Sequence, residues 1–442
     1  MHNDSYMSDT YELPGPLGQD PKVKLKSYAD GTNTCVTIAF DSHGRILTTS
    51  ASMLSFRLLL LDPQSLEVLA SYDLPDRDPT DPLFPYDDTS GATYFVLDDE
   101  DRIILADSEN SIQLVKFFDD PKEFKLVKRF DLSEHIVQKI PPARDHIQMA
   151  IPSWDGRYLW FTSRYGMVGT IDIESGKIHT MELTGEELEN SFAMAEDGAY
   201  IVSDHAMYRF ESDEDGKPKT TWRTEYDRGS EVKPSNFNQG SGTTPQIFGD
   251  LVAIGDNAEP RMNILFLLRT DGSEACKVPV FDEGESTTEN ALPGVVRKGA
   301  NGLEYSVIVD NNYGIQRNKV MQPGGAWTEH VGHMVRVDAV EQKDGTWKCE
   351  QVWESMEKSS QVLPKLSLQN AILYIYTYEP EDNGDYKWFL SGLDFHTGQT
   401  VFSTPTGTGI DYANFGQPLA LGPDGTAYLG TMGGLLRISD SH

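Results

Sequence analysis

The stretch "GQPLALGPDGTAYLGT", Gly416–Thr431, decides the fold prediction. It contains a short apolar run, a turn with the pair Asp-Gly, and a second apolar run. Asp-Gly turns between β-rich runs are the strongest short-range signal of a β-hairpin. The same arrangement recurs along the chain, so we interpret this hairpin as one unit of an internal repeat.

Further copies of the hairpin occur throughout the chain, and one of them has a longer turn. They begin at Cys35, Ala92, Ile147, Asn190, Thr243, Ala291 and Leu363. Most copies are followed by two more strand-like runs, such as "MVGTIDIESG" and "KIHTMELTG" after the copy from Ile147. The unit is therefore a four-stranded meander of roughly 45–55 residues, which is typical of a β-propeller blade.

The count of units predicts an all-β chain with a single propeller of eight four-stranded blades. The last unit has only three strands, and the run "KVKLKSYAD" from Lys22 is expected to supply the fourth. Such a closure joins the two ends of the chain and removes an exposed sheet edge. Seven blades with an irregular insert is the alternative, and the uncertain unit runs from Ala291 to about Ser355. We assign residues 1–21 to an N-terminal extension and 22–442 to the propeller.

The last copy resembles the repeat of pyrroloquinoline-quinone-type propellers, a superfamily with eight blades. Members that hold the quinone typically place it between a tryptophan and a disulfide of adjacent cysteines. This chain has no Cys-Cys pair, so the resemblance implies the fold, and the quinone is not expected as a cofactor. The stretch "GSGTTPQIFGDLVAIGDNAEPRMN" from Gly240 is similar to bacterial proteins identified only as quinoprotein-like propellers, and this adds no activity.

Composition limits the partners. The 442 residues are 38% hydrophobic and carry a formal net charge of −32. Such an acidic chain repels nucleic acid and anionic membranes, so we expect neither as a partner. A small-molecule substrate and a monomer or small homo-oligomer are expected instead.

The cysteines and the first residues bear on the compartment. Cys35, Cys276 and Cys349 indicate neither a disulfide framework nor a zinc site. The first residues lack the basic and apolar regions of a signal peptide, and no stretch reaches the roughly 18 apolar residues of a membrane span. The expected location is cytoplasmic, and a signal removed earlier is left open.

Two apolar strands end in the pair Asp-Asn, in "DNAEPR" at Asp256–Arg261 and "DNNYG" at Asp310–Gly314. In a propeller, the turn between the second and third strands lies on the same face as the loop that leads into the innermost strand. Loops on a rigid scaffold often hold functional groups. Asp and Asn are common in turns for structural reasons alone. A turn does not require the charged and aromatic residues that accompany these two pairs, so we interpret those residues as the sign of a site. The predicted substrate-binding residues are Thr243, Glu259, Arg261, Asn311 and Asn312.

Two chemistries fit this face. The first is a divalent cation of the calcium type, with oxygen ligands from Asn190, Asp256, Asn257 and Asp310. Here "LENSFAMAEDGAYIVSD" from Leu188 is similar to a strand that bears a metal-binding Asn in six-bladed propellers of the gluconolactonase class, and this likeness applies only to Asn190. The second is acid–base catalysis, since histidine titrates near neutral pH. Its predicted catalytic residues are His146, His205, Tyr313 and Arg164.

The function predicted from these patterns is an enzyme with a polar site in the central channel. It would act on a small polar or cyclic organic substrate, by acid–base or metal-assisted chemistry, as a lyase, hydrolase or isomerase. The alternative is a non-catalytic propeller that binds a ligand or a protein. Phe84, Pro85 and Tyr86 fit either an apolar patch for such a partner or a loop over the channel. The sequence contains no G-x-S-x-G elbow and no Walker or Rossmann fingerprint in a strand–helix context.

Overall fold

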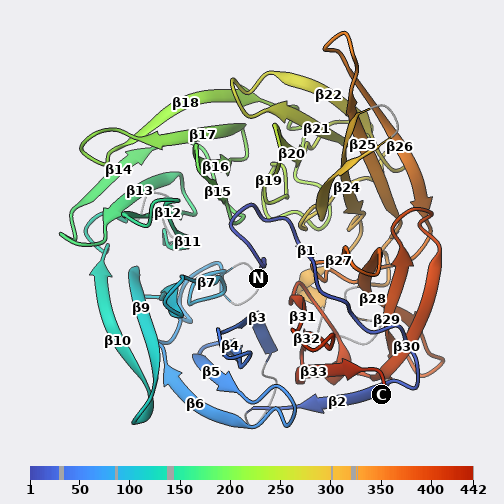
Figure 1. The fold of residues 1–442 in the computed structure, drawn as a ribbon, viewed down its shortest axis with the longest axis horizontal. Helices are drawn as coiled ribbons and strands as arrows, with labels where there is room; N and C mark the ends of the chain where they lie inside the picture. Colours follow the sequence, from blue (N-terminus) through green and yellow to red (C-terminus); the bar gives the residue numbers. More distant parts are fainter. Residues whose placement is uncertain are drawn as a thin grey trace.

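A computed structural model describes residues 1–28, 34–84, 88–136, 144–299, 302–319, 325 and 327–441. These residues form eight four-stranded blades arranged as a ring around a central channel, and the short strand β1 adds a fifth strand to the sheet of the seventh blade (Figure 1). The protein is therefore an all-β chain with a single eight-bladed β-propeller, as the repeat predicted. Within the described residues, no helix is both long and apolar enough to cross a membrane.

The first four blades follow one another along the chain, and the first strand of each is the innermost. They are β3 (Thr34–Phe40), β4 (Ile46–Ala51), β5 (Phe56–Leu61) and β6 (Val68–Asp73); β7 (Phe95–Leu97), β8 (Arg102–Ala106), β9 (Ser111–Asp119) and β10 (Lys122–Asp131); β11 (Ile147–Pro152), β12 (Tyr158–Ser163), β13 (Met167–Asp172) and β14 (Ile178–Glu182); and β15 (Ala193–Ala195), β16 (Gly198–Val202), β17 (Ala206–Ser212) and β18 (Pro218–Glu225).

The last four blades repeat this order, except that the final strand of the eighth comes from near the N-terminus. They are β19 (Gln246–Phe248), β20 (Leu251–Gly255), β21 (Asn263–Leu268) and β22 (Glu274–Pro279); β23 (Gly294–Lys298), β24 (Leu303–Asp310), β25 (Met334–Glu341) and β26 (Trp347–Ser355); β27 (Lys365–Ser367), β28 (Ile372–Pro380), β29 (Tyr386–Asp394) and β30 (Thr400–Thr408); and β31 (Leu419–Leu421), β32 (Ala427–Thr431), β33 (Gly434–Ser439) and β2 (Lys22–Lys26). Short 3-10 helices lie at Arg317–Lys319 and Ile410–Tyr412.

The hairpin of Gly416–Thr431 forms as its sequence predicts. The Gly422 backbone N–H donates to the Thr426 carbonyl at 2.8 Å, and Gly425 has φ of 75°. Glycine adopts this left-handed conformation without the steric cost that a Cβ atom adds. The Asp424 carboxylate accepts from the Thr426 backbone N–H at 3.2 Å, which closes the turn.

The eighth blade is completed by the N-terminal strand. β2 pairs antiparallel with β33, from Lys22 opposite Ser439 to Lys26 opposite Leu435. Val23 and Leu25 pack against the apolar cluster of blades 7 and 8. This pairing confirms the predicted closure. The sixth blade is regular in its strands, and its extra length lies between β24 and β25, so the seven-bladed alternative is wrong.

The core lies between neighbouring blades. One apolar cluster joins blades 5 and 6 and includes Phe266, Tyr305 and Val337. The Phe248 ring contacts the Tyr305 ring with centroids 5.7 Å apart. Burying a side chain of this size stabilises the fold by about 1.5–3 kcal/mol. The face-to-face contacts between blades therefore fix the rigid ring that positions the loops.

Two of the cysteines form a disulfide, contrary to the expectation from the sequence. Cys276 in β22 and Cys349 in β26 join the outermost strands of blades 5 and 6, with Cα atoms 6.3 Å apart. Their separation of 73 residues gives no local spacing signal, and only the stacking of adjacent blades brings them together. Cys35 is a free thiol, and burial raises its pKa to about 12.

The first eleven residues, which we call the channel segment, run through the middle of the ring (Figure 1). Backbone N–H groups of four successive blades donate to its carbonyls, within 2.7–3.0 Å: Met194 to Ser5, Ile247 to Tyr6, Gly294 to Ser8 and Leu366 to Asp9. Its strand β1 (Thr10–Tyr11) pairs in parallel with β27. Met7 is buried in the core cluster of blades 3 to 5. The segment is thus an integral part of the channel wall on the side of blades 4 to 7.

Candidate functional site

The loops that lead into the inner strands and the turns between second and third strands meet on one face, as predicted. The Arg164 backbone N–H, after β12, donates to the His146 carbonyl, before β11, at 2.9 Å. The Asn312 N–H, after β24, donates to the Thr287 carbonyl, ahead of β23, at 2.9 Å. We call this the site face of the propeller.

Two predicted catalytic residues come together on the site face. His146 is 6% exposed and Arg164 is 4% exposed, and the Arg164 guanidinium forms an ion pair with the carboxylate of Glu189. The His146 Nε2 atom lies 3.2 Å from the Thr89 hydroxyl, which lies 2.9 Å from the Gln148 side-chain oxygen. We call His146, Arg164, Glu189, Thr89 and Gln148 the mouth cluster.

Burial controls the protonation of the mouth cluster. It lowers the pKa of His146 to about 4; the charge of Asp88 opposes this effect, and the charges of Arg164 and Arg77 reinforce it. The imidazole is therefore uncharged at neutral pH. Burial also raises the pKa of the Tyr94 phenol, and the negative charges of Glu189 and Glu289 raise it further. The Tyr94 phenol therefore remains protonated, under the influence of carboxylates in the loops that lead into blades 4 and 6.

The mouth cluster holds two buried donors that lack acceptors. Neither Nε of Arg164 nor Nε2 of Gln148 has a hydrogen-bond partner among the described residues. Leaving a buried donor unsatisfied costs about 1–3 kcal/mol. Both donors belong to residues beside His146.

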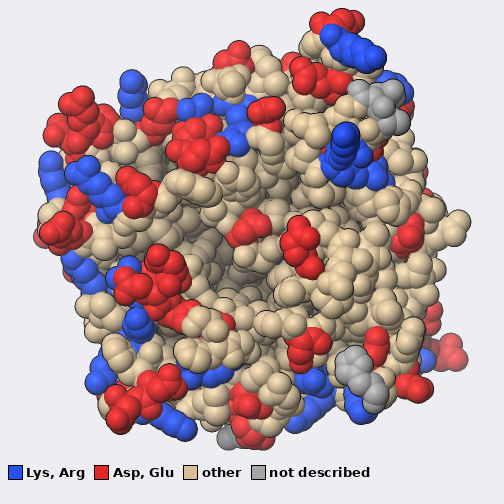
Figure 2. All heavy atoms as spheres, in the orientation of Figure 1, with Lys and Arg blue, Asp and Glu red and all other residues tan. Residues whose placement is uncertain are grey.

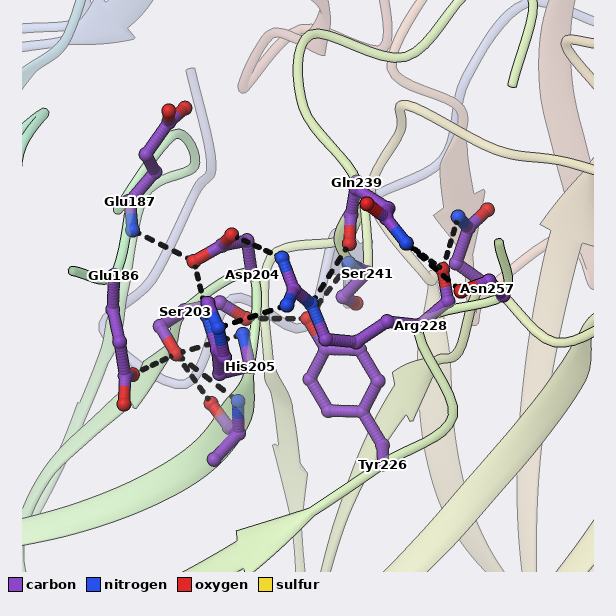
Figure 3. Close-up of polar contacts among 12 residues, drawn as sticks. Glu186, Glu187, Ser203, Asp204, His205, Tyr226, Arg228, Gln239, Ser241 and Asn257 are labelled. Carbon is purple, nitrogen blue, oxygen red and sulfur yellow. Dashed lines mark hydrogen bonds and ion pairs between the residues drawn. The ribbon is translucent and has the colours of Figure 1, made fainter. Parts of the chain in front are cut away.

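His205 lies in a second cluster at the turn after β16 (Figure 3). Its Nδ1 atom is 2.9 Å from an Asp204 oxygen, and its Nε2 atom is 2.8 Å from Nη1 of Arg228. A guanidinium has only donors, so Nε2 is the acceptor and the ring proton is on Nδ1. Arg228 also binds Asp204 at 2.6 Å. Both ring nitrogens are occupied, and the cluster ties the loop after β18 to blade 4.

The first Asp-Asn pair organises its own turn and the preceding loop. Asp256 accepts from the backbone N–H groups of Ala258 and Asn263 at 3.1 and 2.6 Å, and from the Asn263 amide at 2.7 Å. The Asn257 amide donates to the Arg228 and Glu231 carbonyls at 2.8 and 3.2 Å. The Asn257–Arg228 contact and the nearby Gln239 appear in Figure 3. Turn closure and loop anchoring therefore account for both polar residues.

The second Asp-Asn pair is bonded in a similar way. One Asp310 oxygen accepts from the Asn290 and Asn312 amides at 3.0 and 2.8 Å. Asn312 accepts from the Glu289 N–H at 2.8 Å, and the Asn311 amide donates to the Glu285 carbonyl at 2.7 Å. Burial raises the pKa of Asp310 and that of Asp256 to about 6, against the effect of these hydrogen bonds.

The other predicted site residues make their contacts outside the mouth cluster. Thr243 is fully buried and accepts from the Gly255 N–H at 3.0 Å. Glu259 is exposed and accepts from the Ser230 hydroxyl at 2.9 Å. Tyr313 and Asn190 are partly buried at their loop positions, as is Arg261. Within the described part of the chain, no group of three or more His, Cys, Asp or Glu side chains is placed to hold a metal ion.

Several residues of the site face were not selected from the sequence. Gln148 lies near the start of a strand and belongs to no sequence motif. Nothing in the sequence distinguishes Tyr94 from an ordinary strand residue. Arg228 is far in sequence from its partner Asp204. Glu189 could have been found, because it directly precedes Asn190 in the loop that leads to β15. Of the proposed apolar patch, Phe84 is partly buried in a turn, and Pro85 and Tyr86 lie outside the described residues.

Comparisons of the sequence and of the structure with known proteins identify a distant relative and several similar folds. No protein-family profile matches the chain. A protein of Archaeoglobus fulgidus named "Uncharacterized protein" is 24% identical over an alignment of 323 residues, and the match covers 65% of this chain. The matched region spans about 60% of that relative's length.

Several solved structures are similar to this chain over most of its length. Sqt1 of Saccharomyces cerevisiae is 11% identical, with a TM-score of 0.52 over 94% of this chain and 98% of that one. Streptogramin B lyase is 12% identical, with a TM-score of 0.41 over 95% and 97% of the two chains. BamB of Moraxella catarrhalis is 10% identical, with a TM-score of 0.40 over 78% and 95%. At these identities the likeness concerns the fold alone.

Proposed function

We propose that the protein is an enzyme that transfers protons on a small, oxygen-rich organic substrate at the mouth cluster. The observation that carries the proposal is the pair of buried donors without acceptors, on Arg164 and Gln148, near an uncharged histidine. Native proteins rarely leave such groups unsatisfied. A carboxylate, carbonyl or hydroxyl oxygen of a substrate would accept from both.

Each residue has a role that follows from its chemistry. Arg164 would bind a substrate oxygen through its free Nε and stabilise negative charge that develops there. Glu189 fixes the guanidinium through their ion pair. His146 is uncharged and would accept a proton, while the neutral Tyr94 phenol would supply one. This division between acceptor and donor suits a lyase or an isomerase.

The remaining sequence-predicted residues have a supporting place in this proposal. His205 would position the loop around Arg228, since both its ring nitrogens are engaged. The Asn and Asp residues of the two Asp-Asn turns would hold the loops that lead to β19 and β23. A divalent cation supplied with the substrate is a further candidate, and its binding is tested by the same assays with and without a chelator.

The test is a screen of small carboxylates, lactones and sugar acids for thermal stabilisation, followed by detection of turnover by NMR. We expect compounds that stabilise the wild type to be converted. Arg164→Met should lose binding, and His146→Gln should bind but lose turnover by about a hundredfold or more. His205→Gln is the matched control, with binding and turnover largely kept. If His146→Gln turned over substrate at the wild-type rate, the acid–base assignment would be wrong.

A second candidate function is a non-catalytic ligand-binding propeller. It is favoured by the extensive use of the predicted polar turns for loop anchoring. In that case the same compounds would bind to the wild type and fail to bind to Arg164→Met, and no variant would show turnover. The NMR assay therefore separates the two functions.

A further inference from the structure

The channel segment fills only part of the channel. Its backbone hydrogen bonds to the ring go to the inner strands of blades 4 to 7, and no described backbone bond joins it to β3, β7 or β11. A cavity of about 430 Å³ remains between the segment and these three strands. Small-molecule sites in proteins have volumes of about 300–1,000 Å³. The molecule is hollowed near the centre of the ring in the view of Figure 2.

This channel cavity lies at the end of the channel away from the mouth cluster. Its wall includes Phe40, Leu97 and Pro152, where the inner strands of blades 1 to 3 end. His146 precedes the start of the same inner strand, β11, at the opposite end. The cavity is therefore separate from the site of the proposed function.

The wall of the cavity is rich in aromatic rings. Phe40, Phe95, Tyr11 and Trp154 line it, and Trp154 is 59% exposed at its rim. The Trp154 ring lies 5.8 Å from the Tyr6 ring of the channel segment. An exposed tryptophan beside a cavity offers an apolar, π-rich surface to a ligand. Faces of aromatic rings attract cations, and they do so most strongly for tryptophan.

The charges in the cavity wall also favour a cationic ligand over an anionic one. The residues that line the cavity include no Lys or Arg, and they include the carboxylate of Asp4. Asp4 accepts from the backbone N–H of Ser8 at 2.9 Å and from the Ser8 hydroxyl, and it forms no ion pair with a described basic side chain. The nearby Glu196, by contrast, is paired with Arg269 at 3.0 Å. The overall charge of −32 further disfavours anions.

We infer that the channel cavity binds a small organic cation with an apolar body, such as an aryl-alkyl ammonium compound. The ring or chain would pack against Phe40, Phe95 and Trp154, and the cationic head would face Asp4. Anionic compounds of the same shape would bind more weakly, because the wall holds no Lys or Arg, and His2, which also lines it, is already paired with Asp9 at 2.8 Å. The inference does not depend on the function proposed for the mouth cluster.

The test uses phenylbutylamine, phenylbutanol and phenylbutyrate, which share a ring and chain and differ in charge. Affinities for the full chain are measured by calorimetry at about physiological ionic strength, which screens long-range attraction. We expect the amine to bind about tenfold more tightly than the alcohol, and the acid to bind more weakly than the alcohol. Asp4→Asn should reduce the amine to the affinity of the alcohol, and Trp154→Ala should weaken both.

Asp99→Asn is the matched control, because Asp99 is an exposed carboxylate on another inner turn, outside the cavity wall. It should leave all three affinities unchanged. Binding of the acid as tight as that of the amine would overturn the inference, as would unchanged amine affinity in Asp4→Asn. Absence of amine binding at millimolar concentration would overturn it as well. The two exposed positions, Asp99 and Trp154, allow these variants to be tested without disturbing the core.

Discussion

Lys365, at the start of innermost strand β27, forms an ion pair with Asp9 of the channel segment, and both side chains are fully buried. Burial alone would raise the pKa of Asp9, but His2 and Lys365 outweigh it and hold that pKa below its usual value. Asp9 is therefore a charged group whose stability inside the channel depends on its partners.

Removing Lys365 should release the channel segment. Lys365→Met leaves the buried Asp9 carboxylate without one of its two partners, and loss of one partner of a buried pair costs about 3–5 kcal/mol. We expect a lower melting temperature and faster proteolysis within the first residues of the chain. The double variant Asp9→Leu with Lys365→Met should recover much of the loss. Equal destabilisation of the single and double variants would contradict the role of the charge pair.

The disulfide between blades 5 and 6 should stabilise the ring. It closes a loop with a sequence separation of 73 residues, for which loop entropy gives up to about 4 kcal/mol. Cys276→Ser should lower the free energy of unfolding in urea. A reductant should lower that of the wild type to a similar value and leave the variant unchanged. If the reductant had no effect on the wild type while the variant was destabilised, packing at position 276 would explain the loss instead.

Arg228 should matter more for stability than His205 does. Arg228→Met leaves the carboxylate of Asp204, which is 7% exposed, without its guanidinium and also frees His205 Nε2. We expect a loss of about 1–3 kcal/mol and increased hydrogen exchange in the loop from Asp227 to Gln239. His205→Gln keeps the Arg228–Asp204 contact, so its loss should be smaller. A larger loss in His205→Gln than in Arg228→Met would show that the histidine holds the loop.

The fold could be predicted from the sequence, but many contacts that hold the site and the channel segment could not. Eight blades and the closing strand at Lys22 follow from local hairpin signals that repeat, so counting was sufficient. The Cys276–Cys349 bond and the Asp9–Lys365 pair join segments far apart in sequence, and no local pattern marks them. The Asp-Asn pairs were located correctly at the turns. Their hydrogen bonds to the preceding loops depend on backbone carbonyls, such as those of Arg228 and Glu285, which carry no sequence signal.

The buried carboxyl of Asp310 should make stability depend on pH. Its folded pKa of about 6 exceeds the ordinary value of 3.8, so the folded protein holds the proton more tightly than the unfolded chain. Protonation of Asp310 contributes up to about 3 kcal/mol to the free energy of unfolding. This contribution is fully present below about pH 4 and is lost as the pH rises through 6. Asp310→Asn can still accept from Asn290 and Asn312 but cannot ionise. Urea unfolding at pH 4.5 and 7.5 should therefore show a smaller fall in the variant, and Asp256→Asn should act in the same direction. An identical fall in the wild type and Asp310→Asn would place the titrating group elsewhere.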